Sequence, residues 1–378
     1  MIRIGVLVPS SNTVLEPELA RLADGVCLHF SRVRVTRIGV DADAAAQFDT
    51  AAMVGAAELL ADAGVDVIIW GGTAGSWLGV PHDLSIVSAI EAATGVPATT
   101  STLALLEAAR AFGLSRTALV TPYVAEVVSE IVSCYAESGL EVSGGEHLGL
   151  SDNHSFGLVA AGTLQPMIAS ADAPVMVVCT NLRAARVVDL VEASGGPLVL
   201  DSVVATLWGA LRLAGVPVSL PGGGALLRSG ALRADLQSLC AWLLSETAAD
   251  RITVRLDVPE QGLHVDLAAA EAVGPGMRRI AGDPSLDQRA LNTVRWLEAH
   301  RRLLVQPRFG PDPRPPAALI EMYGVNAQML GPVSCGSEMA GWVSVHSGVE
   351  RTWSAADQEA LSLASAQVSE LLKSYQVS

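Results

Sequence analysis

The chain has 378 residues, of which 50% are hydrophobic and 17% are charged, and its formal net charge is -15 at pH 7. This composition is typical of soluble globular proteins with two or three domains and argues against disorder. Because nucleic-acid binding depends on Lys and Arg side chains that neutralise phosphates, the acidic excess also argues against DNA or RNA as a partner.

Residue usage excludes several kinds of cofactor site. The only lysine is Lys373 near the C-terminal end, so none is placed for a pyridoxal phosphate Schiff base or a Walker-type phosphate loop. The five cysteines are scattered without C-x-x-C spacing, which indicates reduced thiols, and the seven histidines form no metal-ligand motif. We therefore expect no metal and no organic cofactor.

The amino-terminal half alternates apolar strand-like runs with amphipathic helical stretches. The first run, 2–8, is too short to span a membrane and is followed by Pro9, so we expect a first strand and a cytoplasmic protein without a membrane partner. The further elements are predicted as a helix at 13–23, strands at 65–70 and 117–119, a helix at 124–136, a strand at 175–178 and a helix at 182–192. Such alternation predicts an α/β fold with doubly wound parallel sheets covered on both faces.

Two segments of this half, 66–73 and 173–181, look like copies of one another. Each carries a small residue and a threonine at the end of an apolar strand, Gly72-Thr73 in the first and Cys179-Thr180 in the second. The repeat predicts two pseudo-symmetric Rossmann-like lobes, at about 1–114 and 115–205, within a domain that extends to residue 220. Only the second copy carries a thiol.

Polar residues at the strand ends are the candidates for a site. Ligands of such sheets bind outside the carboxyl ends of the strands, where Ser11, Asn12, Thr73, Tyr123 and Cys179 would meet. A thiol between a strand and a following helix lies where N–H groups and the helix dipole favour negative charge, so the pKa of Cys179 is expected to move toward neutrality and to suit proton exchange with carbon. The uncharged donors are expected to hold a carboxylate.

Each of these residues also has an ordinary structural interpretation. Free cysteine is among the most buried residue types, and Ser11 and Asn12 before a helix are typical N-caps. Tyr123, which follows a proline, can be a packed aromatic side chain. Glu16 and Glu18 are expected in a solvated first helical turn, where acidic groups suit the dipole.

The carboxy-terminal part begins after a stretch rich in proline and glycine at 216–224, which predicts a linker and a domain boundary between 216 and 230. The pattern beyond it predicts helices at 231–249, 286–301 and 355–373 and strands at 252–256, 303–305, 317–322, 325–330 and 339–345. Strands flanked by helices indicate an α+β module with an antiparallel sheet at 230–378.

Five ordered motifs in the first 215 residues match a known family: Gly5-Val-Leu-Val-Pro9-Ser-Ser-Asn12-Thr13, Gly72-Thr73, Thr121-Pro-Tyr123, Asp152-Asn153 and Cys179-Thr180-Asn181-Leu182-Arg183. Together they resemble the maleate isomerase and arylmalonate decarboxylase branch of the Asp/Glu racemase superfamily. The resemblance implies a cofactor-independent enzyme on small dicarboxylic acids, with Cys179 as the catalytic residue. It places Asn12, Tyr123 and Asn153 around the substrate, and we expect Ser11, Gly72, Thr73 and Thr180 at the neighbouring strand ends to complete the substrate-binding set.

The carboxy-terminal part resembles a second family. The segments Ala249-Asp-Arg-Ile-Thr-Val-Arg-Leu-Asp257 and Gly341-Trp-Val-Ser-Val-His346, followed by a closing helix, look like a GAF domain. Such modules bind small ligands or build dimers. The resemblance therefore implies a small-molecule effector or self-association through this domain, including a homodimer.

Gly72 departs from the racemases and isomerases of the superfamily, which resemble one another in placing a cysteine on each face of the substrate. A single thiol in the second half resembles arylmalonate decarboxylases instead, whereas Asn12, Tyr123 and Asn153 match maleate isomerases. The leading hypothesis is decarboxylation of a substituted malonate, with proton transfer by one cysteine at the carbon alpha to a carboxylate. The alternatives are a maleate-type cis-trans isomerase or racemase of a small dicarboxylate, and a non-catalytic dicarboxylate sensor.

Overall fold

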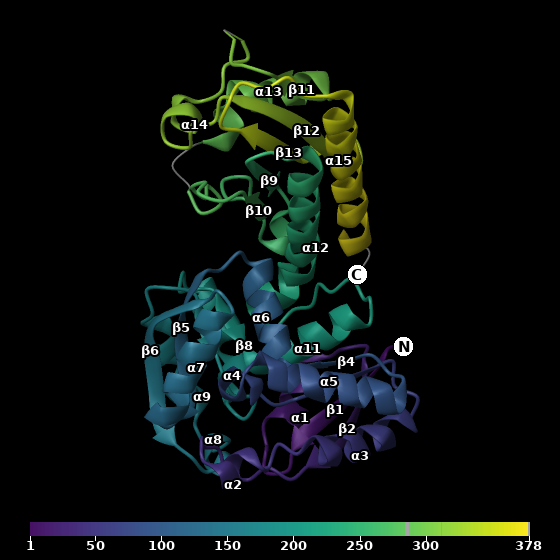
Figure 1. The fold of residues 1–378 in the computed structure, drawn as a ribbon, viewed down its shortest axis with the longest axis vertical. Coiled ribbons are helices and arrows are strands. Elements are labelled where there is room, and N and C mark those ends of the chain that lie inside the picture. Colours follow the sequence, from purple (N-terminus) through teal and green to yellow (C-terminus); the bar gives the residue numbers. More distant parts are fainter. Residues whose placement is uncertain (284–286, 311, 377–378) are drawn as a thin grey trace. The chain divides into compact units, whose positions relative to one another are not determined.

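The computed structural model describes residues 1–283, 287–310 and 312–376 and divides into two compact units (Figure 1). The first unit comprises Met1–Arg110 and Leu114–Ala231, and the second comprises Ala111–Gly113 and Leu232–Ser378. The division falls within helix α12 (Gly224–Thr247), so the predicted linker at 216–224 ends where this helix begins. No described helix combines the length and the apolar character needed to cross a membrane.

The first unit contains two parallel four-stranded sheets with the same strand order. The first sheet has the order β2-β1-β3-β4, formed by β1 (Arg3–Pro9), β2 (Cys27–Val33), β3 (Val67–Trp70) and β4 (Ala98–Thr100). The second has the order β6-β5-β7-β8, formed by β5 (Arg116–Tyr123), β6 (Glu141–Leu150), β7 (Val175–Val177) and β8 (Val199–Asp201). The α/β fold with parallel sheets is confirmed, and the repeated order agrees with the duplication in the sequence.

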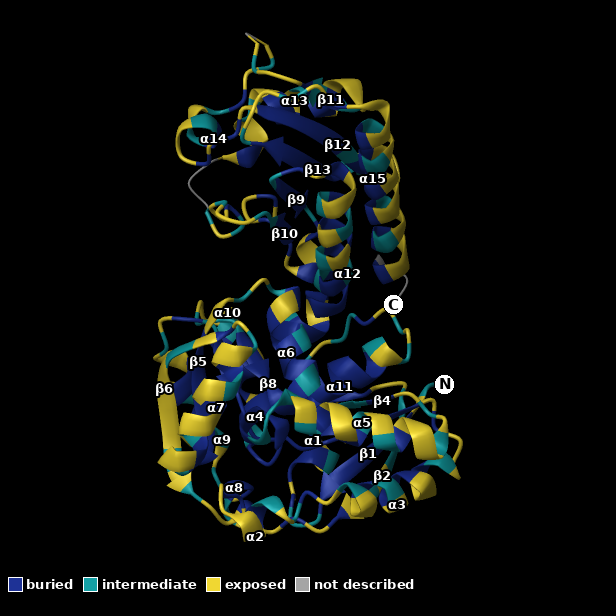
Figure 2. Ribbon diagram, in the orientation of Figure 1, coloured by how far each residue is buried: buried dark blue, intermediate teal, exposed yellow. Residues whose placement is uncertain are grey.

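Both sheets lie between helices. Successive residues of a strand point to opposite faces, and every residue of β3 and β7 is buried, so both faces of these strands are covered. Figure 2 shows exposed stretches on the outer elements of this unit, such as β6, α5 and α7. The helices are α1 (Leu15–Leu22), α2 (Ala42–Ala45), α3 (Thr50–Ala61), α4 (Gly75–Leu78), α5 (Val80–Thr94), α6 (Ser101–Ala111), α7 (Ala125–Glu137), α8 (Asn153–Phe156), α9 (Ala161–Ala169), the 3₁₀ helix η1 (Arg183–Arg186), α10 (Val188–Ala193) and α11 (Ser202–Leu213).

The second unit contains an antiparallel sheet of order β10-β9-β13-β12-β11. Its strands are β9 (Arg251–Leu256), β10 (Ala270–Val273), β11 (Leu304–Gln306), β12 (Ala327–Cys335) and β13 (Glu338–Ser347). Its helical elements are η2 (Pro259–Gln261), η3 (Gln288–Ala290), α13 (Asn292–His300), α14 (Ala317–Glu321) and α15 (Ala355–Gln376), and α15 packs on β12 and β13. The predicted antiparallel sheet is present, and the GAF likeness stays a prediction.

Two sequence-based assignments in the second unit need correction. The segment predicted as a strand at 317–322 is the helix α14, because Pro316 precedes it at the N-cap and Ala, Leu and Glu favour a helix. The helix predicted at 286–301 begins at Asn292, after η3, and its predicted first residue, Leu286, lies outside the described residues.

Candidate functional site

The carboxyl ends of the strands from both lobes meet in the first unit. The Thr73 hydroxyl, after β3, lies 3.0 Å from the Tyr123 hydroxyl at the end of β5. The Asn12 side chain, after β1, donates to the Thr180 hydroxyl over 3.2 Å, and Thr180 donates to the Gly71 carbonyl over 2.8 Å. The repeat therefore brings the predicted strand ends together.

Cys179 occupies the centre of this arrangement. It lies two residues after β7 and its side chain is 2% exposed. Its sulfur accepts the Asn181 amide N–H over 3.4 Å and is hydrogen-bonded to the Tyr123 hydroxyl, and its own N–H donates to Ser202 Oγ over 3.2 Å. The thiol is thus buried. The Tyr123 hydroxyl that bonds it is itself hydrogen-bonded to the Thr73 hydroxyl of the first lobe.

The closed surroundings make Cys179 a weak acid. Burial raises the pKa of the thiol to about 12, and the hydrogen bonds from Tyr123 and Asn181 offset this only in part. The expectation of a pKa near neutrality is wrong. Helix α11 begins at Ser202, which accepts the Cys179 N–H, but desolvation is the largest effect on the pKa of the thiol. The thiol is therefore protonated at neutral pH.

Tyr123 combines an aromatic packing role with a polar one. Its ring makes edge contacts with Trp77, with centroids 5.2 Å apart, and with Phe156 at 5.5 Å, and Trp77 in turn contacts Phe48 at 5.8 Å. Burial raises the pKa of the hydroxyl well above 10, so it stays a hydrogen-bond donor. The ring of Tyr123 therefore belongs to an aromatic cluster, while its hydroxyl is hydrogen-bonded to Cys179.

The other predicted site residues hold the lobes together. Asn12 Oδ1 accepts the N–H groups of Val14 and Leu15 over 2.9 Å each, just before α1, whose N-cap residue is Val14. The Ser11 hydroxyl donates to the Val35 carbonyl over 2.6 Å and accepts from Asn153 Nδ2 over 2.8 Å. In this closed arrangement these side chains are engaged with protein partners.

Gly72 is the pseudo-equivalent of Cys179, since each lies two residues after the central strands β3 and β7. A Cβ atom at Gly72 would lie 2.5 Å from two ring carbons of Trp70 and 2.7 Å from its ring nitrogen. Real Cβ atoms do not approach other atoms that closely. The indole of Trp70, which is fully buried, therefore fills the space where the first copy would carry a side chain.

The sequence did not predict that two carboxylates, those of Glu18 and Asp201, are buried in the first unit. Glu18 is fully buried between Arg186, at 2.5 Å, and Arg21, at 3.0 Å, so its expected place in a solvated turn is wrong, whereas Glu16 is partly exposed and pairs with Arg32. Asp201 caps α11 through the N–H groups of Val203 and Val204, and its pKa is raised to about 7 by burial. The Asp-Ser pair before a helix was a usable N-cap signal for Asp201.

Comparison with known proteins gives matches over the first unit. The sequence profile described as arylmalonate decarboxylase matches residues 4–227. A maleate isomerase of Nocardia farcinica is 30% identical over 246 residues, covering 60% of this chain and 95% of that protein. An arylmalonate decarboxylase of Bordetella bronchiseptica is 31% identical over 231 residues, covering 59% and 89%.

A solved structure agrees with these matches. It is a cysteine-to-serine mutant of the Nocardia farcinica maleate cis-trans isomerase with a covalently bound succinylcysteine intermediate. It aligns with a TM-score of 0.54 and 26% identity over 60% of this chain and 98% of that chain. The similar proteins are isomerases and a decarboxylase, so the sensor hypothesis gains no support from them.

Proposed function

Because this chain belongs to the arylmalonate decarboxylase family, we propose that its first unit decarboxylates a substituted malonate without a cofactor and that Cys179 protonates the intermediate. The observation that carries this proposal is the pairing of one buried, protonated thiol with a glycine at the equivalent position, where a second thiol would have to displace the indole of Trp70. A single acid is sufficient for decarboxylation followed by protonation.

The site residues have separate roles in the proposed reaction. The hydroxyls of Thr73 and Tyr123 donate to one carboxylate of the substrate, and the second carboxylate lies against the aromatic wall of Trp77 and Phe156. Burial of that charge against apolar rings is unfavourable and is relieved when carbon dioxide leaves. The bonding electrons stay on the substrate as an enediolate, which the two hydroxyls stabilise.

Cys179 completes the reaction. Its S–H proton is transferred to the alpha carbon, the thiolate takes a proton from water, and the monocarboxylate product leaves. A thiol with a pKa of about 12 is protonated at neutral pH and is ready to act as an acid. The same property disfavours the thiolate that an addition mechanism requires.

A maleate-type isomerase is the second candidate. The observation that favours it is the 30% identity to the Nocardia farcinica maleate isomerase over 95% of that protein. Its reaction by addition of sulfur to a double bond would have to use Cys179 as a thiolate. The raised pKa of that thiol and the glycine at position 72 make it the weaker proposal.

The test compares the native chain with Cys179→Ser and with Cys134→Ser, a control at a cysteine of helix α7 that is not one of the proposed site residues. Phenylmalonate, methylmalonate and maleate are supplied separately, and products are measured by mass spectrometry. We expect carbon dioxide release from a substituted malonate by the native chain and Cys134→Ser, and a loss of about 10²-fold or more in Cys179→Ser. Fumarate from maleate without decarboxylation would establish the isomerase instead, and no turnover of any of the three would overturn both.

A further inference from the structure

Buried hydrogen-bonding groups without a protein partner are rare in folded proteins, because each costs the free energy of its lost hydration. Among residues 1–283, 287–310 and 312–376, the ring nitrogens of three buried tryptophans have no acceptor: Trp70, Trp77 and Trp208. An N–H group of this kind is satisfied when a ligand brings an acceptor to it. The surroundings of each ring decide whether its N–H group lies at a site.

The N–H group of Trp70 lies beside Gly72. Trp70 is the last residue of β3, and its Nε1 is 2.7 Å from the point where a Cβ atom at residue 72 would stand. The pseudo-equivalent residue of the second lobe is Cys179, whose Cβ carries the thiol. The unpartnered N–H group therefore lies at the first-lobe counterpart of the catalytic thiol.

The residues on either side of Gly72 contact the second lobe. The carbonyl of Gly71 accepts a hydrogen bond from that lobe over 2.8 Å, and the Thr73 hydroxyl lies 3.0 Å from the Tyr123 hydroxyl. Tyr123 is in turn hydrogen-bonded to Cys179. The N–H group beside Gly72 thus belongs to the strand ends that surround the thiol.

The Trp70 ring is held in place before any ligand binds. It is fully buried, and the main-chain carbonyl of Trp70 accepts the Ser101 hydroxyl over 3.2 Å. Ser101 Oγ lies 2.7 Å from Thr206 Oγ1, which ties the end of β3 to helix α11. A donor that is fixed by packing loses little conformational entropy on binding, as a preorganised binding group should.

Trp208 provides a matched reference for Trp70. Its ring is also fully buried, and its Nε1 also has no acceptor among the described residues. Trp208 lies within helix α11, however, and Arg212 lies over its ring at 5.4 Å from the centroid. The two tryptophans therefore share burial and an unpartnered N–H group but differ in their position relative to the strand ends.

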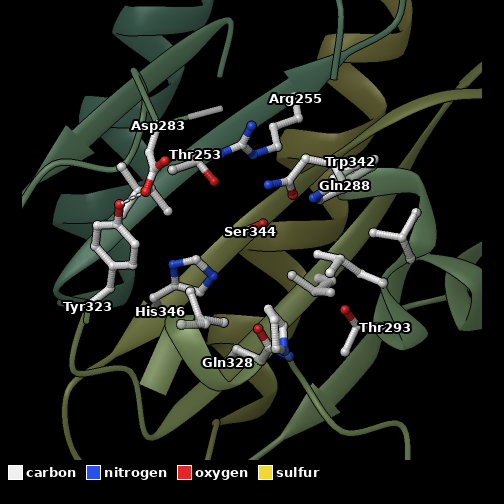
Figure 3. A pocket seen from close by; sticks show the side chains of 16 residues that line it. Thr253, Arg255, Asp283, Gln288, Thr293, Tyr323, Gln328, Trp342, Ser344 and His346 are labelled. Atoms are coloured by element: carbon white, nitrogen blue, oxygen red, sulfur yellow. Dashed lines mark hydrogen bonds between the residues drawn. The ribbon is translucent and has the colours of Figure 1, made fainter. Parts of the chain in front are cut away.

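The second unit holds a small cavity whose charged groups offset one another. Its volume is about 50 Å³, and Figure 3 shows Arg255 and Asp283 among the side chains that line it. The Tyr323 hydroxyl donates to Asp283, and the negative charges of Glu271 and Asp283 act on Arg255. Opposite charges that already act on each other call for no charged ligand, so the N–H group of Trp70 is the stronger sign of a binding site.

The chemistry of the indole limits what it can bind. Nε1–H is a donor only, so its partner must be an acceptor. A carboxylate has about four lone-pair sites, and the two hydroxyls of Thr73 and Tyr123 leave some of these free. A third neutral donor at the same strand ends therefore matches a carboxylate.

We propose that the indole N–H of Trp70 is a substrate-binding group, which donates to the carboxylate held by Thr73 and Tyr123. This assignment rests on the function proposed for the first unit and adds a donor to it. When the carboxylate becomes an enediolate, charge grows on its oxygens and the hydrogen bond strengthens. The second-lobe equivalent of Trp70 is the apolar Val177, so this donor and the Cys179 thiol come from different lobes.

The experiment follows the indole N–H signals of the full chain, labelled with ¹⁵N in tryptophan, by NMR. Phenylacetate and propionate, the products expected from phenylmalonate and methylmalonate, are added separately, and their affinities are measured by calorimetry. We expect the Trp70 signal to move downfield on binding, because its N–H gains a charged acceptor. The Trp208 signal should stay in place.

Three variants identify the signals. Trp70→Phe and Trp208→Phe each remove one signal. Gly72→Ala keeps the Trp70 ring but should shift its signal, because the added Cβ would lie 2.7 Å from Nε1. Gly162→Ala is the control for that substitution, since a Cβ at residue 162 meets no atom within 4 Å. The assignment therefore holds even if Trp70→Phe does not fold.

The same variants measure the contribution of the N–H group. We expect Trp70→Phe to bind the ligand at least about 10-fold more weakly, as loss of a hydrogen bond to a charged group does. Its kcat with a substituted malonate should fall by about 10²–10³-fold, the usual effect of losing one donor to a developing oxyanion. Trp208→Phe should keep the native affinity and kcat.

Three results would overturn the assignment: a Trp70 signal that does not move at saturating ligand, a folded Trp70→Phe that binds as tightly as the native chain, or no binding of either ligand. Turnover of a malonate together with an unmoved Trp70 signal would remove this role and leave the decarboxylase proposal standing. A moving Trp70 signal without turnover of any malonate would instead remove the decarboxylase and leave Trp70 as a carboxylate-binding group.

Discussion

The indole of Trp70 stands in the place that a side chain at Gly72 would take, two residues further along the same strand end. A second thiol therefore cannot be added to the first lobe without moving a fully buried ring. We expect Gly72→Cys alone to lower the free energy of unfolding by about 1–3 kcal/mol, the usual cost of overpacking a core. Chemical denaturation measures this change.

The control for this substitution is Gly162→Cys, where a Cβ meets no atom within 4 Å. A double variant, Gly72→Cys with Trp70→Phe, should recover part of the lost stability, because the two residues are in contact and their effects are not additive. If Gly72→Cys had the same free energy of unfolding as the native chain, the indole of Trp70 would move at no cost, and packing against Trp70 would not explain why residue 72 is a glycine.

Tyr123 and Tyr135 form a matched pair. Both are buried and each bonds a hydroxyl over 3.0 Å, Tyr123 to Thr73 and Tyr135 to Ser76, but only Tyr123 is hydrogen-bonded to Cys179. We expect Tyr123→Phe to lower kcat by about 10²–10³-fold, as loss of one donor to a developing oxyanion does. Tyr135→Phe should cost similar stability and leave kcat unchanged, and equal kinetic losses in both would refute the assigned role.

The raised pKa of Cys179 predicts slow alkylation. Only the thiolate reacts with iodoacetamide, and a thiol with a pKa of about 12 is almost entirely protonated at pH 7. We therefore expect Cys179 to be modified more slowly than the partly exposed Cys27 between pH 6 and pH 9, as followed by peptide mass spectrometry. If Cys179 were modified before Cys27 at pH 7, its thiolate would be available, and this result would favour the isomerase as the function of the chain.

Asp83 predicts a fall in stability with rising pH. Burial raises the pKa of its carboxyl to about 7 from 3.8, so the folded chain holds a proton that the unfolded chain releases. The contribution of Asp83 to the free energy of unfolding is therefore fully present below pH 4, falls by up to about 1.4 kcal/mol per pH unit between pH 4 and pH 7, and levels off above pH 7. Asp201, with a similar pKa, adds a second decline over the same range.

Urea unfolding at several pH values tests this assignment. Asp83→Asn removes one ionisable group and should make the decline between pH 4 and pH 7 shallower, by up to about 1.4 kcal/mol per pH unit. Asp172→Asn is the control, because Asp172 is exposed. An identical decline in Asp83→Asn and in the native chain would contradict the buried protonated carboxyl.

The parallel sheets could be predicted because β3 and β7 are apolar at every position and end in matching residues. The edge strand β6 lacked such a signal, since it is largely exposed and contains two consecutive glycines. Strands at a sheet edge bury little, so hydrophobic periodicity does not reveal them. Helix α14 did carry a local signal, Pro316 followed by residues that favour a helix, which the strand predicted at 317–322 overlooked.

The site was predictable as a set of strand ends but not in its electrostatics. Burial of Glu18 depends on Arg186, 168 residues away in the chain. The pKa of Cys179 depends on how completely both lobes enclose the sulfur, and the closure at Gly72 depends on the rotamer of Trp70. Such properties arise from packing between distant segments, which local sequence patterns do not encode.

The proposed proton donor, Cys179, lies in one lobe and the ring of Trp70 takes the corresponding place in the other, which has a stereochemical consequence. A planar, prochiral intermediate in the proposed reaction would receive its hydrogen from one side only, and an unsymmetrical malonate would then yield a single enantiomer. The handedness of the product would thus follow from an asymmetry between two otherwise duplicated halves.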